Sequence, residues 1–385
     1  MTRPLRIAML AHSTNPRGGV VHALELSEAL TGLGHQVTLH APDARGTGFF
    51  RKTSCETVAI PVAPAVAGMT GMVVQRINDY VEYFAGAGTR AFDIFHAHDG
   101  ISGNALATLK QRGLIHGFAR TVHHIDTFAD PVLVELQDRS IAMADVRFAV
   151  SGKWRSILAN DMGLSADIVS NGVDLRRYAP QTDGRDEELR QKLGLGTGPV
   201  FLNIGGIEQR KNSYNILEAF LQFRSVQPDA QLVIAGGVSL LDHHAYQLKF
   251  SARLRAAGVE AANVHLVGAI DDNDMPALFR LADVLVFASF KEGFGLVVLE
   301  AMASGTPVIV SSIEPFIEYL SNEDVVWCDP HQPGTIADAM VIALNPLMRS
   351  RLLVNGFDVA KRHDWTKVAR AHLPAYQRLL EGVHA

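Results

Sequence analysis

The chain has 385 residues, of which 48% are hydrophobic and 19% charged, a composition typical of globular proteins rather than disordered or fibrous ones. A chain of this length is expected to form two or three domains. Its net charge of −5 and the lack of any run of Lys or Arg argue against nucleic acid as a partner.

Short apolar runs alternate with helix-period segments over residues 1–175, which we expect to form the first domain. Strands are predicted at Leu5–Ala11, Gln36–Ala41, Asp93–His98, Phe118–His123, Val146–Val150 and Ile168–Ser170. Helices are predicted near 19–33, 71–85, 101–112, 131–144 and 152–161. Most of these strands are almost entirely apolar, which indicates a parallel sheet with helices on both faces.

A polar segment that ends in several glycines interrupts this alternation, and we expect residues 176–198 to be a linker. Strands are then predicted at Val200–Ile204, Gln231–Ala235, Val264–Val267, Val284–Ala288, Pro307–Val310 and Val325–Trp327. Helices are predicted at 212–226, 245–257, 273–281, 295–304, 313–320 and 335–343. The pattern indicates two doubly wound α/β domains, 1–175 and 199–362. A final helix in 363–385 is expected to pack back on the first domain, with a kink at Pro374.

The two cysteines, Cys55 and Cys328, lie far apart, which fits a reducing compartment and no disulfide framework. The apolar run Ile7–Ala11 is too short for a signal peptide, and no stretch of 18 apolar residues exists. We therefore expect a cytoplasmic protein without a transmembrane segment.

Polar or glycine-rich motifs follow several predicted strands, where ligands bind in doubly wound folds. Gly18 and Gly19 lead into a helix, so they form either a plain tight turn or a loop that lets the backbone approach an anion. HAHD (96–99) and TVHHID (121–126) end two neighbouring strands. Their side chains could bind a metal ion, face a sugar, or be hydrogen-bonded structural histidines.

The second domain carries two further candidate motifs. Arg210 and Lys211 lie between a strand and a helix, where they form either a phosphate site or a solvated basic pair. Glu292 and Glu300 have seven residues between them, and Gly295 begins a helix that places Leu296 and Glu300 on one face. Because Glu300 has almost entirely apolar neighbours, a bound ligand explains it better than an exposed helix face.

The ordered set of motifs resembles the retaining glycosyltransferases of family 4, which have the GT-B architecture of two Rossmann-like domains with an interdomain cleft. The resemblance rests on the Gly18-Gly19 loop, GHQVTLHA (34–41), DIFHAHD (93–99), TVHH (121–124), SNGVD (170–174), GGIEQRKN (205–212), VHLVGAI (264–270), ADVLVFAS (282–289) and EGFGLVVLEAMASGTPVI (292–309). It implies a nucleotide-sugar donor bound mainly by the second domain.

The resemblance also implies roles for individual residues. Arg210 and Lys211 would hold the diphosphate, Glu292 the donor-sugar hydroxyls, and Glu300 the ribose. Backbone groups of the remaining donor-site residues would contact the donor, with the base near Ile270; these residues are Gly18, Gly19, Ile270, Phe294, Gly295 and Leu296. His123 would lie at the reacting centre, and the candidates on the acceptor side are His98, Asp99 and His124.

One position departs from the family, which often has Arg where this chain has Gly206, so Arg210 is expected to supply that cation. No DxD-type acidic metal motif is evident at the predicted donor site, and we expect metal-independent, retaining transfer by front-face attack of the acceptor. The candidate acceptors are lipids, glycans and small molecules. The helix at 71–85 carries Arg76 but also Asp79 and Glu82, which does not favour a basic membrane-surface helix. Peripheral membrane contact stays open.

Two alternative functions are weighed against transfer. A non-catalytic sugar-nucleotide-binding protein would bind the donor without hydrolysing or transferring it. A metal-dependent hydrolase would use a cluster of His96, His98 and His123.

Overall fold

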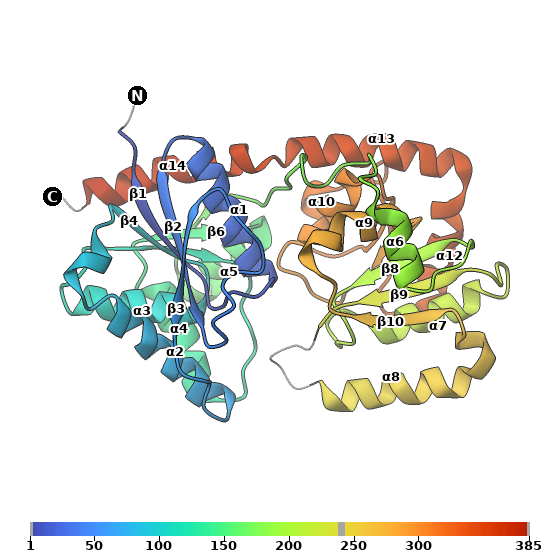
Figure 1. The fold of residues 1–385 in the computed structure, drawn as a ribbon, viewed down its shortest axis with the longest axis horizontal. Helices are drawn as coiled ribbons and strands as arrows, with labels where there is room; N and C mark the ends of the chain where they lie inside the picture. The colour runs from blue at the N-terminus through green and yellow to red at the C-terminus, as the bar shows by residue number, and fades with distance from the viewer. Residues whose placement is uncertain (1–2, 238–242, 383–385) are drawn as a thin grey trace. The chain divides into compact units, whose positions relative to one another are not determined.

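The computed structural model describes residues 3–237 and 243–382, which form two compact α/β units. Unit 1 contains residues 1–171 and 365–385, and unit 2 contains residues 172–364. Each unit is built on one parallel sheet, as the alternation of strands and helices predicted (Figure 1).

The sheet of unit 1 has seven parallel strands in the order β3-β2-β1-β4-β5-β6-β7. The strands are β1 (Arg6–Leu10), β2 (Gln36–Asp43), β3 (Glu56–Pro61), β4 (Ile94–Ala97), β5 (Ala119–Val122), β6 (Val146–Ala149) and β7 (Asp167–Ile168). The edge strand β3 was not predicted: Ile60 alone of its six residues is buried, and Pro61 interrupts its apolar run. The chain reverses direction across the sheet between β1 and β4, so ligands are expected beyond the carboxyl ends of these strands.

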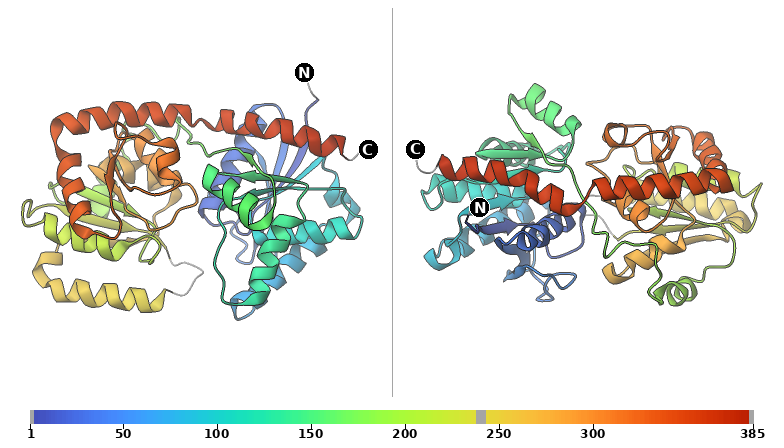
Figure 2. Two further views of the ribbon diagram at one scale, coloured as in Figure 1. Left: turned by 180° about the vertical axis from the view of Figure 1, so that it is seen from behind. Right: turned by 90° about the horizontal axis from the view of Figure 1, so that it is seen from above.

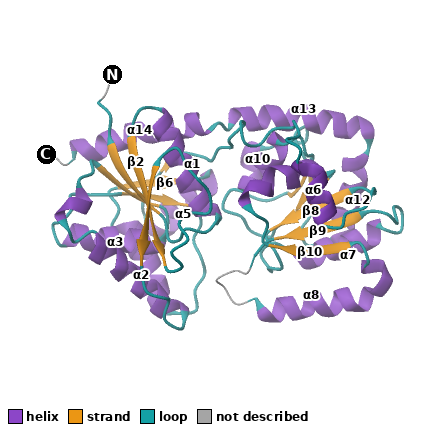
Figure 3. Ribbon diagram, viewed as in Figure 1, coloured by secondary structure: helices purple, strands orange, loops and turns teal. Residues whose placement is uncertain are grey.

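Helices cover both faces of this sheet (Figure 3). They are α1 (Gly18–Gly32), α2 (Met69–Tyr83), α3 (Gly100–Gln111), α4 (Pro131–Ala142), α5 (Gly152–Met162) and α14 (Trp365–Glu381), with a 3₁₀ turn at Ala87–Arg90. The last helix, α14, packs against α1 and so belongs to unit 1, although its sequence follows all of unit 2 (Figure 2). It continues as one helix through Pro374.

The sheet of unit 2 has six parallel strands in the order β10-β9-β8-β11-β12-β13. The strands are β8 (Val200–Ile204), β9 (Gln231–Ala235), β10 (Val264–Gly268), β11 (Val284–Phe287), β12 (Val308–Ser311) and β13 (Val326–Cys328). The helices are α6 (Arg185–Lys192), α7 (Ser213–Phe223), α8 (His244–Ala257), α9 (Met275–Leu281), α10 (Leu296–Ala303), α11 (Phe316–Tyr319), α12 (Pro333–Leu344) and α13 (Pro346–Arg362), with 3₁₀ turns at Gly258–Ala261 and Asp272–Asp274.

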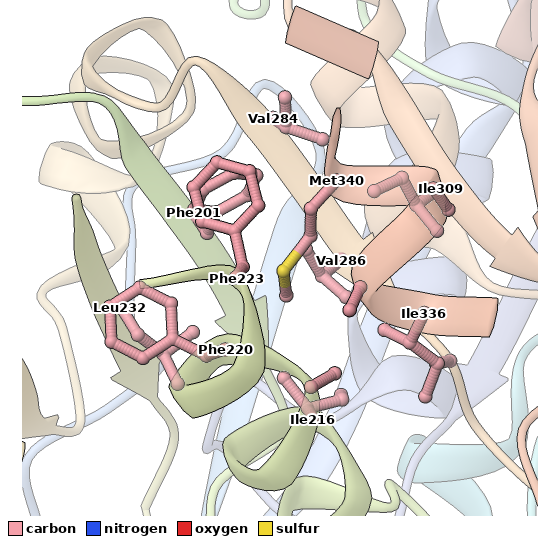
Figure 4. Close-up of a cluster of buried hydrophobic side chains, with 14 of the residues drawn as sticks. Phe201, Ile216, Phe220, Phe223, Leu232, Val284, Val286, Ile309, Ile336 and Met340 are labelled. Carbon is pink, nitrogen blue, oxygen red and sulfur yellow. The ribbon is translucent and has the colours of Figure 1, made fainter. Parts of the chain in front are cut away.

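One core of unit 2 lies where α7 and α12 pack on the sheet (Figure 4). Phe201 packs edge-to-face on Phe223, with ring centroids 4.9 Å apart. Both strands and helices contribute fully buried side chains, among them Ile216, Phe220, Leu232, Val284, Val286, Ile309, Ile336 and Met340. Burial of each such side chain stabilises the folded state by about 1.5–3 kcal/mol. The packed layer therefore holds the strands of unit 2 in place, including the strand ends that carry the candidate site.

The structure corrects the linker expected at 176–198, because that segment is part of unit 2 and contains α6. Acidic residues in the first turn and basic residues in the last turn stabilise this helix through its dipole. Leu189 is buried, and Arg280 Nε donates to Asp186 Oδ1 at 2.8 Å. The high polarity of residues 176–198 is therefore that of a surface helix and not that of a linker.

Helix α13 was also missed. Pro346 is its first residue, and the Asn345 side chain accepts hydrogen bonds from the backbone N–H groups of Leu347 and Met348. This Asn-Pro pair is a helix start signal that was available in the sequence. Within the described ranges, no helix is both long and apolar enough to span a bilayer.

Candidate active site

Lys211 is held at the carboxyl end of β8 by two unusual backbone positions. Gly205 has φ +135°, and a Cβ atom there would lie 2.6 Å from Lys211 Cγ, so only glycine leaves room for the lysine stem. Asn212 has φ +59° and directly precedes α7. The Lys211 ammonium lies 4.5 Å from the centre of the Phe287 ring, at the end of the adjacent strand β11. The turn therefore directs a buried cation toward the loop after β11.

Glu292, in that loop, meets both predicted cations. Lys211 Nζ lies 2.8 Å from Glu292 Oε1, and Arg210 Nη1 lies 3.1 Å from Oε2. The side chains of Glu292 and Lys211 are 6% and 14% exposed, whereas that of Arg210 is 44% exposed. The sequence predicted these three residues to serve one ligand, and the structure brings them together as an ion triad.

The electrostatics of the triad favour an ionised carboxylate. Burial opposes ionisation, but the positive charges of Lys211 and Arg210 outweigh it and lower the pKa of Glu292. Burial lowers the pKa of the Lys211 ammonium, against the opposing effect of Glu292. A second carboxylate, Glu208, lies 3.7 Å from Arg210, so the two cations face two carboxylates in a partly dehydrated place, where an anion would interact with the cations more strongly than in water.

Glu300 is buried within α10, with 8% of its surface exposed. The charge of Glu300 acts on Tyr178. Burial is the main cause that raises the pKa of Tyr178, and the Glu300 carboxylate raises it further. Leu296 begins α10 and is partly exposed one turn before Glu300, so the predicted shared face is present. A buried carboxylate on this face is chemically suited to accept hydrogen bonds from vicinal hydroxyls.

Phe294 and Ile270, which were also predicted to contact the donor, differ in burial. The Phe294 ring is buried and stacks on Tyr319, with centroids 4.6 Å apart and an interplanar angle of 3°, so its side chain is structural. The Tyr319 hydroxyl donates to the Phe294 carbonyl at 3.3 Å. Ile270 is partly exposed, just beyond the end of β10.

We expect Gly295→Ala to destabilise unit 2 by about 2–3 kcal/mol. Gly295 has φ +94° at the start of α10, and a Cβ atom there would lie 2.6 Å from Phe316 Cε1, so alanine adds both backbone strain and a clash. The matched control is Gly32→Ala at the end of α1, where nothing lies within 4 Å of the new Cβ. Urea unfolding would measure both changes, and equal stability of the two variants would contradict the prediction.

In unit 1, the ends of β4 and β5 bring His98 and His123 together. His98 Nδ1 lies 3.2 Å from His123 Nε2. A Cβ atom on Gly19 would lie 3.4 Å from His123 Cδ2, so the start of α1 contacts this imidazole, whereas a Cβ on Gly18 would meet nothing. Burial, followed by the positive charge of neighbouring groups, keeps the pKa values of His98 and His123 well below the ordinary value.

The two adjacent imidazoles His123 and His124 have different surroundings. The His124 side chain is 54% exposed, and its Nε2 lies 3.1 Å from Asp126 Oδ2. Asp99 caps α3 by accepting the Ser102 N–H at 2.8 Å. The candidates on the acceptor side therefore divide into a buried imidazole, an exposed imidazole and a helix-capping carboxylate.

His96 is a structural residue rather than a metal ligand. Its Nδ1 lies 2.7 Å from the Tyr376 hydroxyl, and its Nε2 lies 2.8 Å from Thr121 Oγ1. Both ring nitrogens are therefore engaged in the interior of unit 1. Among the residues that the structure describes, no group of three or more His, Cys, Asp or Glu side chains is arranged to hold a metal ion. The cluster expected for the hydrolase alternative is not formed as a ligand set.

Two models of known families match consecutive parts of the chain. The model for glycosyl transferases group 1 matches residues 185–356, and the model for glycosyltransferase family 4 matches residues 16–177. The chain belongs to glycosyltransferase family 4. Its enzymatic class is therefore that of a glycosyltransferase, as predicted.

Relatives of this glycosyltransferase align over nearly the whole chain. It is 28% identical to phosphatidyl-myo-inositol mannosyltransferase of Mycobacterium tuberculosis over 390 residues, which cover 97% of each chain. It is 27% identical to D-inositol 3-phosphate glycosyltransferase 2 of Catenulispora acidiphila, covering 99% of this chain and 97% of the relative. The structure of sucrose-phosphate synthase from Thermosynechococcus elongatus superposes with a TM-score of 0.80, at 20% identity and with 98% and 99% coverage. The fold is GT-B.

The departure of this glycosyltransferase from its family at Gly206 has a structural reason. Gly206 has φ +72°, and a Cβ atom there would lie 3.3 Å from the carbonyl oxygen of Gly237. An arginine at this position would strain the backbone. The nearby Arg210 reaches Glu292 instead, so the site contains a second cation.

One residue beside His123 was not predicted. The His22 ring lies edge-on to His123, with centroids 4.7 Å apart, and its Nδ1 is 2.8 Å from Asn171 Oδ1. The sequence contained a signal for the position of His22, because His22 and Leu26 are four residues apart on the buried face of α1. Helical periodicity would have placed an imidazole near the glycine turn.

Proposed function

We propose that this enzyme transfers a sugar, with retention of configuration and without a metal ion, from a nucleoside diphosphate sugar to an acceptor hydroxyl. The observation that carries the proposal is the ion triad of Lys211, Arg210 and Glu292, which lies in the same unit as the buried Glu300. Lys211 and Arg210 would bind the diphosphate, Glu292 the sugar hydroxyls and Glu300 the ribose. His123 of unit 1 would contact the donor sugar.

In the proposed reaction, the bond between the anomeric carbon and the diphosphate oxygen breaks as the acceptor oxygen bonds to the same face of that carbon. The acceptor proton passes to the leaving diphosphate. Lys211 and Arg210 would stabilise the charge that develops there, so the proposed reaction requires no divalent cation. Front-face attack is favoured because the carboxylates that follow the strands of the first domain, Asp99 and Asp126, are the evident candidates for a nucleophile, and Asp99 Oδ1 is engaged in capping α3.

The acceptor is proposed from the relatives. Their names give phosphatidyl-myo-inositol and D-inositol 3-phosphate as substrates. Inositol-bearing compounds are therefore the first acceptors to test with this enzyme, followed by other sugars and lipids.

We expect one class of nucleotide sugar to raise the melting temperature of unit 2. A donor at 100 times its Kd stabilises the folded state by about 2.7 kcal/mol, or roughly 5–10 °C for a unit of this size. Thermal-shift measurements with UDP-, GDP- and ADP-sugars would identify the donor. The shift should be lost in Glu300→Gln and kept in the control Glu218→Gln, whose carboxylate pairs with Arg253 on the surface.

Two results would contradict parts of the proposal. A full thermal shift in Glu300→Gln would remove Glu300 from the donor site. Donor binding to the wild-type enzyme with neither hydrolysis nor transfer, over a broad set of acceptors, would instead favour the binding-protein alternative.

A further inference from the structure

A chain of polar contacts runs from the interior of unit 1 to His123. Met9 Sδ lies 2.8 Å from His98 Nε2, and His98 Nδ1 lies 3.2 Å from His123 Nε2. Met9 is fully buried in β1, and His98 is 3% exposed just beyond β4. Within the part of the chain that the structure describes, the other nitrogen of His123, Nδ1, has no hydrogen-bond partner.

Protons can be assigned along this chain because a thioether accepts hydrogen bonds but cannot donate them. A neutral imidazole carries one N–H, and burial lowers the pKa values of His98 and His123 so that both rings are neutral near pH 7. The N–H of His98 then points at Met9 from Nε2, which leaves Nδ1 as an acceptor. His123 must donate to it from Nε2, and its own lone pair lies on Nδ1.

The orientation of the His123 ring is fixed by packing as well. Gly19 lies against one part of the ring, where a Cβ atom would be 3.4 Å from Cδ2. His22 packs on it at an interplanar angle of 74°. With the ring held in place, the position of the proton alone decides which nitrogen can accept a hydrogen bond.

We propose that Met9 and His98 are positioning residues that fix His123 as its Nε2–H tautomer, so that Nδ1 accepts a hydrogen bond from a hydroxyl of the donor sugar. This inference rests on the proposed function, which assigns donor-sugar contact to His123. An accepting nitrogen selects a sugar that carries this hydroxyl over a deoxy analogue, because the deoxy sugar leaves the nitrogen unpaired.

The tautomers can be measured without any activity assay. In protein labelled with ¹⁵N-histidine, long-range ¹H–¹⁵N spectra at pH 7.5 report which ring nitrogen carries the proton, with signals assigned by His98→Asn and His123→Asn. We expect Nε2–H for both rings in the wild type. Met9→Leu keeps the side-chain volume but removes the sulfur acceptor, and it should give a mixture of His123 tautomers. The control Met340→Leu changes a buried methionine of unit 2 and should leave both signals unchanged.

Kinetics then test whether the tautomer matters for transfer. If Met9→Leu populates the two tautomers equally, the KM for the donor should rise roughly twofold, because only half of the free enzyme is competent to bind it, and kcat should change less. Nδ1–H on His123 in the wild type, or an unchanged tautomer in Met9→Leu, would overturn the proposal. An unchanged KM for the donor despite a shifted tautomer would overturn the positioning role. Absence of transfer by the wild type would overturn the proposed function, while the spectra would still decide the tautomer.

Discussion

Replacing Lys211 by Met is expected to lower kcat/KM by roughly 10²–10³-fold, the range observed when one preorganised charge-stabilising group is removed. The Lys211 side chain is 14% exposed and its ammonium lies 2.8 Å from Glu292, so solvent screens the charge little. The leaving diphosphate gains negative charge as the sugar departs. Loss of this cation would therefore raise the energy of the transition state more than that of the bound donor.

The same substitution also affects folding, and a second variant separates the two effects. Lys211→Met leaves Glu292 buried without its nearest cation, and breaking a buried ion pair costs about 3–5 kcal/mol. Arg210 still lies 3.1 Å from Glu292, so we expect the lower end of this range. The double variant Lys211→Met/Glu292→Gln removes both charges. It should regain stability in urea unfolding and remain inactive.

Arg210 provides the matched comparison. Its side chain is 44% exposed, so water and salt screen it more than they screen Lys211. We expect Arg210→Met to lower kcat/KM about tenfold, with a smaller change in stability. Initial rates at several donor concentrations would measure both variants. Wild-type transfer by Lys211→Met would remove the lysine from the reaction, and equal losses in the two variants would contradict the argument from burial.

Strand positions were predicted well because parallel strands covered on both faces are continuous apolar runs, which the sequence displays directly. The strand-end rule also led to Lys211 and Glu292, since β8 and β11 are neighbours in the sheet. The same reasoning failed for β3, which lies at the edge of the sheet and buries one of its six residues. It failed again for 176–198, where a charged surface helix has the composition of a linker.

Side-chain pairing at the site was harder to predict than position. Glu292 was expected to face sugar hydroxyls, and the ion pairs that it forms with Arg210 and Lys211 join residues about eighty positions apart. The imidazoles grouped with His123 are His22 of α1, His96 of β4 and His98 in the loop after β4. Helix α14, from the other end of the chain, adds His372. Such contacts depend on helix packing and on strand register, neither of which a single sequence determines.

Unit 1 is expected to lose stability steeply as the pH falls from about 6.5 toward 4. Burial lowers the pKa of His22 to about 3 and that of His372 to about 4, so the folded state keeps both rings neutral. The unfolded chain binds a proton at each ring below pH 6.5. Each such histidine therefore lowers the free energy of unfolding by about 1.4 kcal/mol per pH unit within this window, and contributes no pH dependence above it. Burial of His40, whose pKa is lowered to about 4, adds a third contribution of the same sign.

The measurement can be confined to unit 1. The chain has three tryptophans, and Trp154 and Trp365 lie in unit 1 while Trp327 lies in unit 2. In a Trp327→Phe background, fluorescence reports the urea unfolding of unit 1 at pH 7.5, 6 and 5. These three histidines alone predict a slope of roughly 4 kcal/mol per pH unit, a large part of the stability of an ordinary domain, and the buried His96, His98 and His123, whose pKa values are also lowered, add to it with the same sign.

His372→Asn should reduce that slope by about 1.4 kcal/mol per pH unit. The asparagine amide can replace His372 Nδ1 in its 2.8 Å hydrogen bond to the Val368 carbonyl, but it does not titrate. The smaller side chain leaves a cavity and lowers the stability at pH 7.5, so the slope and not the absolute value is the test. His124→Asn is the control, because the His124 side chain is 54% exposed rather than buried. If His372→Asn kept the slope of its parent, proton uptake by the buried imidazoles would not be what destabilises unit 1 in acid.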